Sequence, residues 1–176
     1  MPKKGKIKNG NNKAKHTKLL NQKKNKIREQ KFRNKKNIKT LIVKSNLYKS
    51  LCYCGSGISY KTCCAIAHND IKKVKTAEQL MRSRYTAFVL CNIDYLMESH
   101  HSSTRPNHEK SEILKWAKSV KWISLEVLNC IKGTDLDEEG TVEFKAFFNE
   151  LNKDMVIHEK SKFVKEDGAW VYLGEF

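Results

Sequence analysis

Long apolar runs are missing from this 176-residue sequence. No stretch approaches the roughly 20 apolar residues that a helix needs to cross a bilayer, so we expect no membrane span. The first residues are rich in lysine and asparagine and lack the apolar core of a secretory signal peptide. We therefore expect a reducing compartment, the cytoplasm, or the nucleus in a eukaryote. In such a compartment clustered cysteines bind metal more often than they form disulfides.

Acidic residues are almost absent from the first fifty positions. Glu29 is the single acid there against 18 lysines and arginines, whereas the remaining positions hold 17 basic and 18 acidic residues. Residues 1–46 contain too few apolar side chains to offset the entropy cost of folding, which predicts a disordered basic arm. Because aromatic residues are scarce there, we expect the arm to bind the phosphates of RNA or ribosomes with little base selectivity. A solubility tail and a targeting signal are the alternatives.

Catalytic motifs are also missing. The sequence contains no nucleophile elbow, no glycine loop of the kind that binds phosphates and no convincing acid/base pair. We therefore favour a binding or adaptor protein without enzymatic activity.

Cysteine, in contrast, is concentrated in "CYCGSGISYKTCC", residues 52–64, which predicts a small module over residues 47–70. A tetrahedral zinc site with four thiolates places its sulfurs roughly 3.8 Å apart, given Zn–S bonds of about 2.3 Å. The spacing of Cys52, Cys54, Cys63 and Cys64 allows such a site, and glycines between the two pairs let the chain turn. A site with four protein ligands would be structural, because no coordination position stays open.

Other arrangements of these cysteines remain open. Two disulfides would conflict with a reducing compartment, and a bond between Cys52 and Cys54 would be strained. The thiols could instead be small buried hydrophobic groups. His68 would replace one ligand if one thiol of the adjacent pair Cys63 and Cys64 pointed away. The module could also dock a protein partner.

The remainder, residues 71–176, has the pattern of an α+β domain. Thr76 and Gln79 have the spacing of a capping box before an apolar series of helical period. Further helices are expected from Asn92 and through 108–120. Four strand-like runs follow at 122–131, 141–151, 155–164 and 169–174, with turn signals at 152–154 and 166–168. Helices first and strands afterwards predict helices packed on one face of an antiparallel sheet.

Two resemblances support this division. "CYCGSGISYKTCC" resembles the SEC-C zinc motif, with Tyr53 where proline is common, which implies zinc held by the four cysteines. "TAEQLMRSRYTAFVLCNIDYLMESHH" and "HEKSKFVKEDGAWVYLGE" resemble the YchJ family, in which a SEC-C motif precedes an NTF2-like domain. The resemblance covers about residues 50–175 and implies a cone of helices wrapped by a curved sheet. The family has no established activity, and the basic arm departs from its pattern.

Glu159 is the one candidate for acid/base chemistry. It alternates with Met155, Ile157 and Phe163 on a largely apolar strand face. A carboxylate there could be a general base of a small-molecule enzyme. We favour instead a structural ion pair with Arg82 or Arg84, since an unpaired buried charge is costly.

The remaining candidates are weaker. His100, His101 and His108 lie near a helix end and a loop, where cap or loop roles are more common than metal binding. Cys91 and Cys130 are expected to be core thiols. Six aromatic residues could fill a core or line a pocket: Trp116, Trp122, Phe144, Phe148, Phe163 and Trp170.

Overall fold

The computed structural model describes residues 29–30, 33 and 50–176. The predictions for the basic arm, residues 1–46, concern residues that lie almost entirely outside this described part. The described residues 50–176 belong to one compact unit. None of the helices described is long and apolar enough to cross a membrane.

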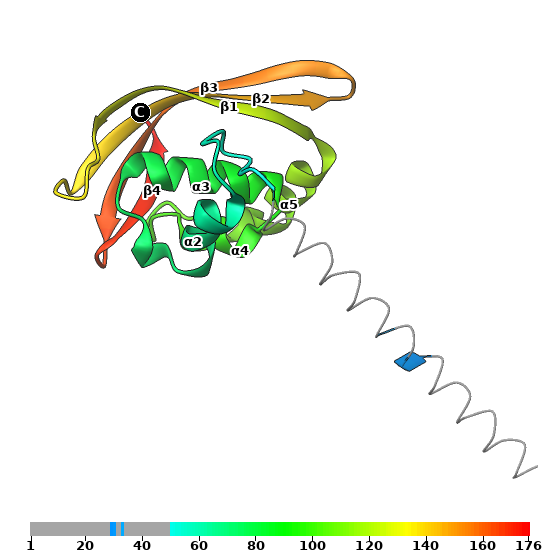
Figure 1. The fold of residues 1–176 in the computed structure, drawn as a ribbon, viewed down its shortest axis with the longest axis horizontal. Coiled ribbons are helices and arrows are strands. Elements are labelled where there is room, and N and C mark those ends of the chain that lie inside the picture. The colour runs from blue at the N-terminus through cyan, green and yellow to red at the C-terminus, as the bar shows by residue number, and fades with distance from the viewer. Residues whose placement is uncertain (1–28, 31–32, 34–49) are drawn as a thin grey trace, which may run out of the picture. The chain divides into compact units, whose positions relative to one another are not determined.

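A four-stranded antiparallel sheet makes one layer of this unit (Figure 1). Its strands follow chain order, and each turns back on the one before it. A turn is present close to the one predicted at 152–154, but it is formed by Leu151 and Asn152, both with positive φ, as a tight hairpin requires. The strands are β1 (Lys121–Lys132), β2 (Glu139–Glu150), β3 (Lys153–Glu166) and β4 (Ala169–Glu175). The four predicted strands are all present, with ends within a few residues of those expected.

Helix α3 (Ala77–Val89) lies beneath the curved sheet (Figure 1). Its start agrees with the predicted capping box, because the Thr76 hydroxyl accepts a hydrogen bond from the backbone N–H of Gln79 at 3.1 Å. The Gln79 side chain accepts from the backbone N–H of Lys75 at 2.8 Å. Leu80, Met81 and other apolar side chains of α3 pack into the main core with the inner face of the sheet.

Within residues 50–176, three other α-helices accompany α3: α2 (Cys64–Asn69), α4 (Ile93–Glu98) and α5 (Lys110–Ser119). Helices α2 and α4 pack on α3, and the sheet covers its other side (Figure 1). The restart expected at Asn92 is present, since its side chain caps α4 by accepting from the N–H of Tyr95 at 3.3 Å. The predicted α+β architecture is therefore confirmed.

Every second residue of β2 faces the helices and is buried, as strand alternation predicts. The same period places Ile157, Glu159 and Ser161 of β3 on the inner face, with Glu159 paired to Phe144 of β2. At the outer edge of β4, Tyr172 exchanges backbone hydrogen bonds with residues 99–101 after α4. This pairing brings His100 and Ser99 to the same end of the sheet as Glu159.

Candidate functional site

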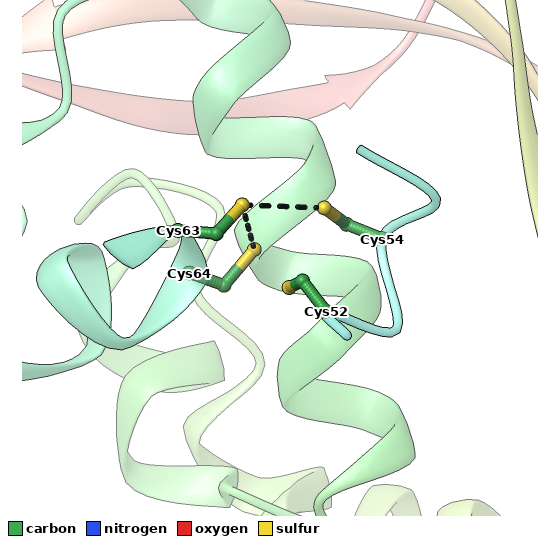
Figure 2. A group of neighbouring side chains, drawn as sticks. All are labelled: Cys52, Cys54, Cys63 and Cys64. Carbon is green, nitrogen blue, oxygen red and sulfur yellow. Dashed lines mark hydrogen bonds between the residues drawn. The ribbon is translucent and has the colours of Figure 1, made fainter. Parts of the chain in front are cut away.

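The four clustered cysteines come from two segments that the local backbone brings together (Figure 2). Cys52 and Cys54 lie in a tight loop, closed by a 2.8 Å hydrogen bond from the N–H of Cys52 to the carbonyl of Ile58. Gly55 and Gly57 both have φ of +76°, a region that side chains disfavour, so the loop depends on these two glycines. Cys63 and Cys64 stand at the start of α2 and face the loop (Figure 2).

The sulfurs of these cysteines converge. All four lie within 4.8 Å of one another, with 3.5 Å between Cys54 and Cys63 and 3.9 Å between Cys63 and Cys64. These separations match the roughly 3.8 Å expected between thiolates around tetrahedral zinc. The cysteines are free thiols, and Cys63 alone is not buried. The donor set and its spacing therefore fit a metal ion.

Protons are shared unequally among the thiols. Hydrogen bonding with Cys54 and Cys64 lowers the pKa of Cys52, and the interaction with Cys52 raises the pKa of Cys64. A thiolate, the form that ligates metal, is therefore favoured within the cluster.

Helix α3 supplies polar groups around the sulfurs. The buried hydroxyl of Thr86 donates a hydrogen bond to the Cys64 sulfur at 3.3 Å. Arg82 donates to the carbonyl of Cys54 at 2.8 Å and forms an ion pair with Glu78 at 2.7 Å. The cysteine module is thus bonded to the first helix of the second domain.

His68 does not join the cluster. Its Nε2 lies 2.9 Å from the carbonyl of Ser83, so this nitrogen carries the proton. Its Nδ1 then accepts from the hydroxyl of Tyr60, also at 2.9 Å. Burial lowers the pKa of His68, which keeps the ring neutral. With all four thiols converging, the imidazole is instead a link between α2 and α3.

A separate cavity of about 300 Å³ lies between the inner face of the sheet and the helices. Most of its wall is apolar. Aromatic side chains in the wall include Tyr85, Phe88, Trp116, Trp122, Phe144 and Phe163. Trp116 and Trp122 meet edge to face with ring centroids 5.4 Å apart. Some of the predicted core aromatics therefore line a pocket, while Trp170 is fully buried in the core.

Five polar side chains also border this cavity: Arg84, His100, Glu159, Ser161 and Tyr172. The expected ion pair between Glu159 and Arg82 or Arg84 is not formed among the described residues. Glu159 instead accepts hydrogen bonds from Ser161 and, at 3.1 Å, from Tyr172. Two hydroxyls bond to one carboxylate oxygen, Oε1, where a cation was predicted.

Arg84 uses other partners. Its Nη1 donates to the carbonyl of Leu96 at 3.0 Å and to the hydroxyl of Ser99 at 2.8 Å. The guanidinium also lies over the ring of Tyr172, 4.6 Å from its centroid. Burial lowers the pKa of Arg84 to about 10, so it remains a cation at neutral pH.

The neighbouring groups are neutral at that pH. Burial, assisted by the Glu159 carboxylate, raises the pKa of Tyr172 to about 12. Burial, with repulsion from Arg84 and Arg105, lowers the pKa of His100 to about 4. Arg84 and Glu159 are therefore the charged groups of the cavity wall.

The two remaining histidines and the two remaining cysteines considered from the sequence lie outside both sites. His101 lies 3.5 Å from Glu166 and His108 is exposed, and within the described residues only the cysteine cluster has the spacing of a metal site. The prediction that Cys130 is a core thiol is wrong: it is exposed, although it pairs with Val142 on the helix-facing side of the sheet and lies 3.8 Å from Glu78 of α3. Cys91 is half-buried in the turn after α3 and has positive φ.

Comparison with known proteins agrees with this arrangement. A family model described as the middle, NTF2-like domain of YchJ matches residues 76–174. The chain belongs to the YchJ family. A UPF0225 protein of Vibrio parahaemolyticus is 44% identical over 124 residues, covering 70% of this chain and 73% of that relative. A UPF0225 protein of Chromobacterium violaceum is 42% identical over 125 residues, covering 71% and 91%.

Two solved structures resemble this YchJ family member. The solution structure of a SEC-C motif containing protein from Rhodopseudomonas palustris has a TM-score of 0.62 at 31% identity, covering 71% of this chain and 96% of that chain. The crystal structure of a SEC-C motif containing protein from Psychrobacter arcticus also has a TM-score of 0.62, at 28% identity, covering 72% and 82%. Both share the combination of fold and motif.

Three polar residues of this YchJ family member were not predicted as site residues: Thr86, Ser99 and Tyr172. Each contacts a residue that is more than ten positions away in the sequence, so no local sequence pattern identifies the contact. Ser161 is different, because it lies two residues after Glu159 and therefore on the same strand face. That spacing could have identified it as a hydrogen-bond partner.

Proposed function

We propose that this chain is a zinc-containing, non-enzymatic binding or adaptor protein that contacts RNA or ribosomes through residues 1–46. The observation that carries the proposal is the separation of charge along the chain. The first fifty residues hold 18 of the 35 lysines and arginines and one of the 19 acids. Lysines and arginines with few aromatic neighbours bind phosphates, and this binding is driven by the release of counterions. It favours contact with the RNA backbone over recognition of a base sequence.

Zinc is the metal we propose for Cys52, Cys54, Cys63 and Cys64. Four soft thiolates at these separations favour it, and four protein ligands leave no position for substrate. Bound zinc would supply structure, by holding the loop of residues 52–57 against α2 and α3. The ion would therefore stabilise the module rather than carry out chemistry.

The module itself is proposed to dock a protein. Four large apolar side chains on it are exposed: Leu51, Tyr53, Ile58 and Ile66. Exposed apolar groups gathered on one small module are typical of a contact surface.

A small-molecule enzyme is the second candidate, favoured by the open cavity with Glu159 in its wall. Glu159 has no ion-pair partner among the described residues, which suits an acid or base. We rank it second because the sequence contains no nucleophile elbow and because the Arg84 cation lies in the same wall as Glu159.

The test compares RNA retention by the full chain and by residues 47–176. Affinity of the full chain for single-stranded RNA should fall with salt, with a slope of about −0.7 per phosphate contacted. The truncated chain should lose RNA retention at physiological salt and keep its metal content and melting temperature. Equal retention by the two forms would refute RNA binding by the arm.

A further inference from the structure

Arg84 and Glu159 are each only half satisfied by the fold. Both hydroxyl donors of Glu159, Ser161 and Tyr172, bond to the same oxygen, Oε1. Among the described residues Oε2 has no hydrogen-bond partner. Arg84 shows the converse arrangement, since its acceptors in residues 96 and 99 both bond to Nη1. Its Nη2 and Nε have no partner within the described part of the chain.

These half-satisfied groups belong to one cavity wall. Tyr172 joins them, because its ring lies under the Arg84 guanidinium and its hydroxyl donates to Glu159. The two charges nevertheless form no ion pair with each other within the described residues. A cation and an anion therefore both contact Tyr172. Each is hydrogen-bonded through one atom, Nη1 of Arg84 or Oε1 of Glu159, and has further polar atoms available to a ligand. Leaving such groups unpaired in a part-buried site is costly, so a bound partner would stabilise both.

The rest of the cavity specifies an apolar body. The aromatic part of the cavity wall contains Phe88, Trp116 and Trp122. Their rings pack against one another at centroid distances of 5.4 to 6.1 Å. The volume of about 300 Å³ is at the small end of ligand pockets. A compound with one or two rings suits it better than a nucleotide cofactor.

We propose that this cavity binds a small zwitterion with an aromatic body, of the aromatic α-amino acid type. The ligand carboxylate pairs with Nη2 and Nε of Arg84, and the ligand ammonium pairs with Oε2 of Glu159. The ring lies among the aromatic side chains of the wall. This assignment concerns binding and is independent of the arm and of any reaction in the cavity.

The charge of the site distinguishes a zwitterion from simpler ligands. A carboxylate alone would pair with Arg84 and face the Glu159 carboxylate without compensation. An amine alone would have the converse problem with Arg84. His100 and Tyr172 do not alter this balance, since both are neutral at physiological pH. Only a ligand with both charges satisfies both open groups.

The decisive experiment is calorimetric titration of the full-length protein with a matched ligand series. L-Phenylalanine and L-tryptophan should bind, whereas 3-phenylpropionate, which lacks the ammonium, and phenethylamine, which lacks the carboxylate, should each bind roughly 10- to 100-fold more weakly. Glycine should not bind detectably because it has no apolar body. Equal affinity for either half-ligand, or no binding of both amino acids at millimolar concentration, would overturn the proposal.

A variant adds a second readout. Glu159→Gln removes the charge but can keep the hydroxyl contacts, so it should weaken L-phenylalanine and leave 3-phenylpropionate unchanged or tighter. Glu143→Gln is the matched control, because Glu143 lies on the adjacent strand and pairs with His158, away from the cavity. The proposal fails if Glu159→Gln does not change the preference between the two ligands, or if Glu143→Gln changes it equally.

Discussion

The hydroxyl of Thr86 in α3 donates a hydrogen bond to the sulfur of Cys64 in α2, 3.3 Å away. The same hydroxyl lies 3.8 Å from the sulfur of Cys52. A fully buried residue of the NTF2-like domain thus contacts both halves of the cysteine cluster. The two modules that the sequence separates are bonded to each other at the candidate metal centre.

Thr86→Val tests this connection. The substitution keeps the shape of the side chain and removes the donor to sulfur, which should cost about 1 kcal/mol of unfolding free energy. It should also speed removal of metal by a chelator. Denaturant unfolding and the rate of metal release measure the two effects. Ser56→Ala removes an exposed hydroxyl 3.2 Å from the Cys63 sulfur and should have a smaller effect on both. Identical effects of the two variants would contradict the role of Thr86.

His68→Gln separates a structural histidine from a metal ligand. Because His68 links Tyr60 to Ser83, its loss should lower stability by roughly 1–3 kcal/mol. The metal content should stay at one zinc per chain, since four thiols complete the site. Cys64→Ser is the comparison and should reduce the zinc content. Elemental analysis showing zinc loss in His68→Gln protein that remains folded would make His68 a ligand.

Glu159→Gln should change stability little. The ion pair expected from sequence would have made this substitution cost roughly 3–5 kcal/mol. With two hydroxyls as partners the cost should be about 1 kcal/mol or less, because a glutamine oxygen can accept the same bonds. Comparing the thermal melting of the variant with that of the parent protein measures this cost. A large decrease would show that the Arg84 charge depends on Glu159.

Stability should fall as the pH is lowered from about 6.5 towards 4. The folded state holds the pKa of His100 at about 4, below its ordinary value of 6.5. Between these values the unfolded chain binds more protons than the folded one, so acid favours unfolding, and the loss is complete below the folded pKa. His68, whose pKa is also lowered, contributes in the same direction.

His100→Gln isolates that contribution. Its melting temperature should decrease less than that of the parent over this pH range. Metal content is measured at each pH, so that acid release of metal is accounted for separately. Parallel melting curves of variant and parent would show that His100 titrates normally.

Local patterns in the sequence were sufficient for the elements and for the cysteine cluster. The Thr76 cap, the alternation of β2 and the inward position of Glu159 depend on neighbours within a few residues, so backbone geometry alone determines them. The Cys52–Cys64 stretch is equally local, and its two glycines permit the turn that gathers the sulfurs.

Tertiary structure determined the hydrogen-bond partners of the polar side chains. Glu159 accepts from Tyr172 because β4 pairs with β3, and Arg84 bonds to residues 96 and 99 because α4 packs on α3. Cys130 is exposed although it faces α3, because β1 is an edge strand and the neighbour there is the polar Glu78, which an apolar run could not reveal. Such contacts join residues far apart in sequence. They depend on the free energy of the whole packed arrangement, whereas caps and strand alternation depend on a few adjacent residues.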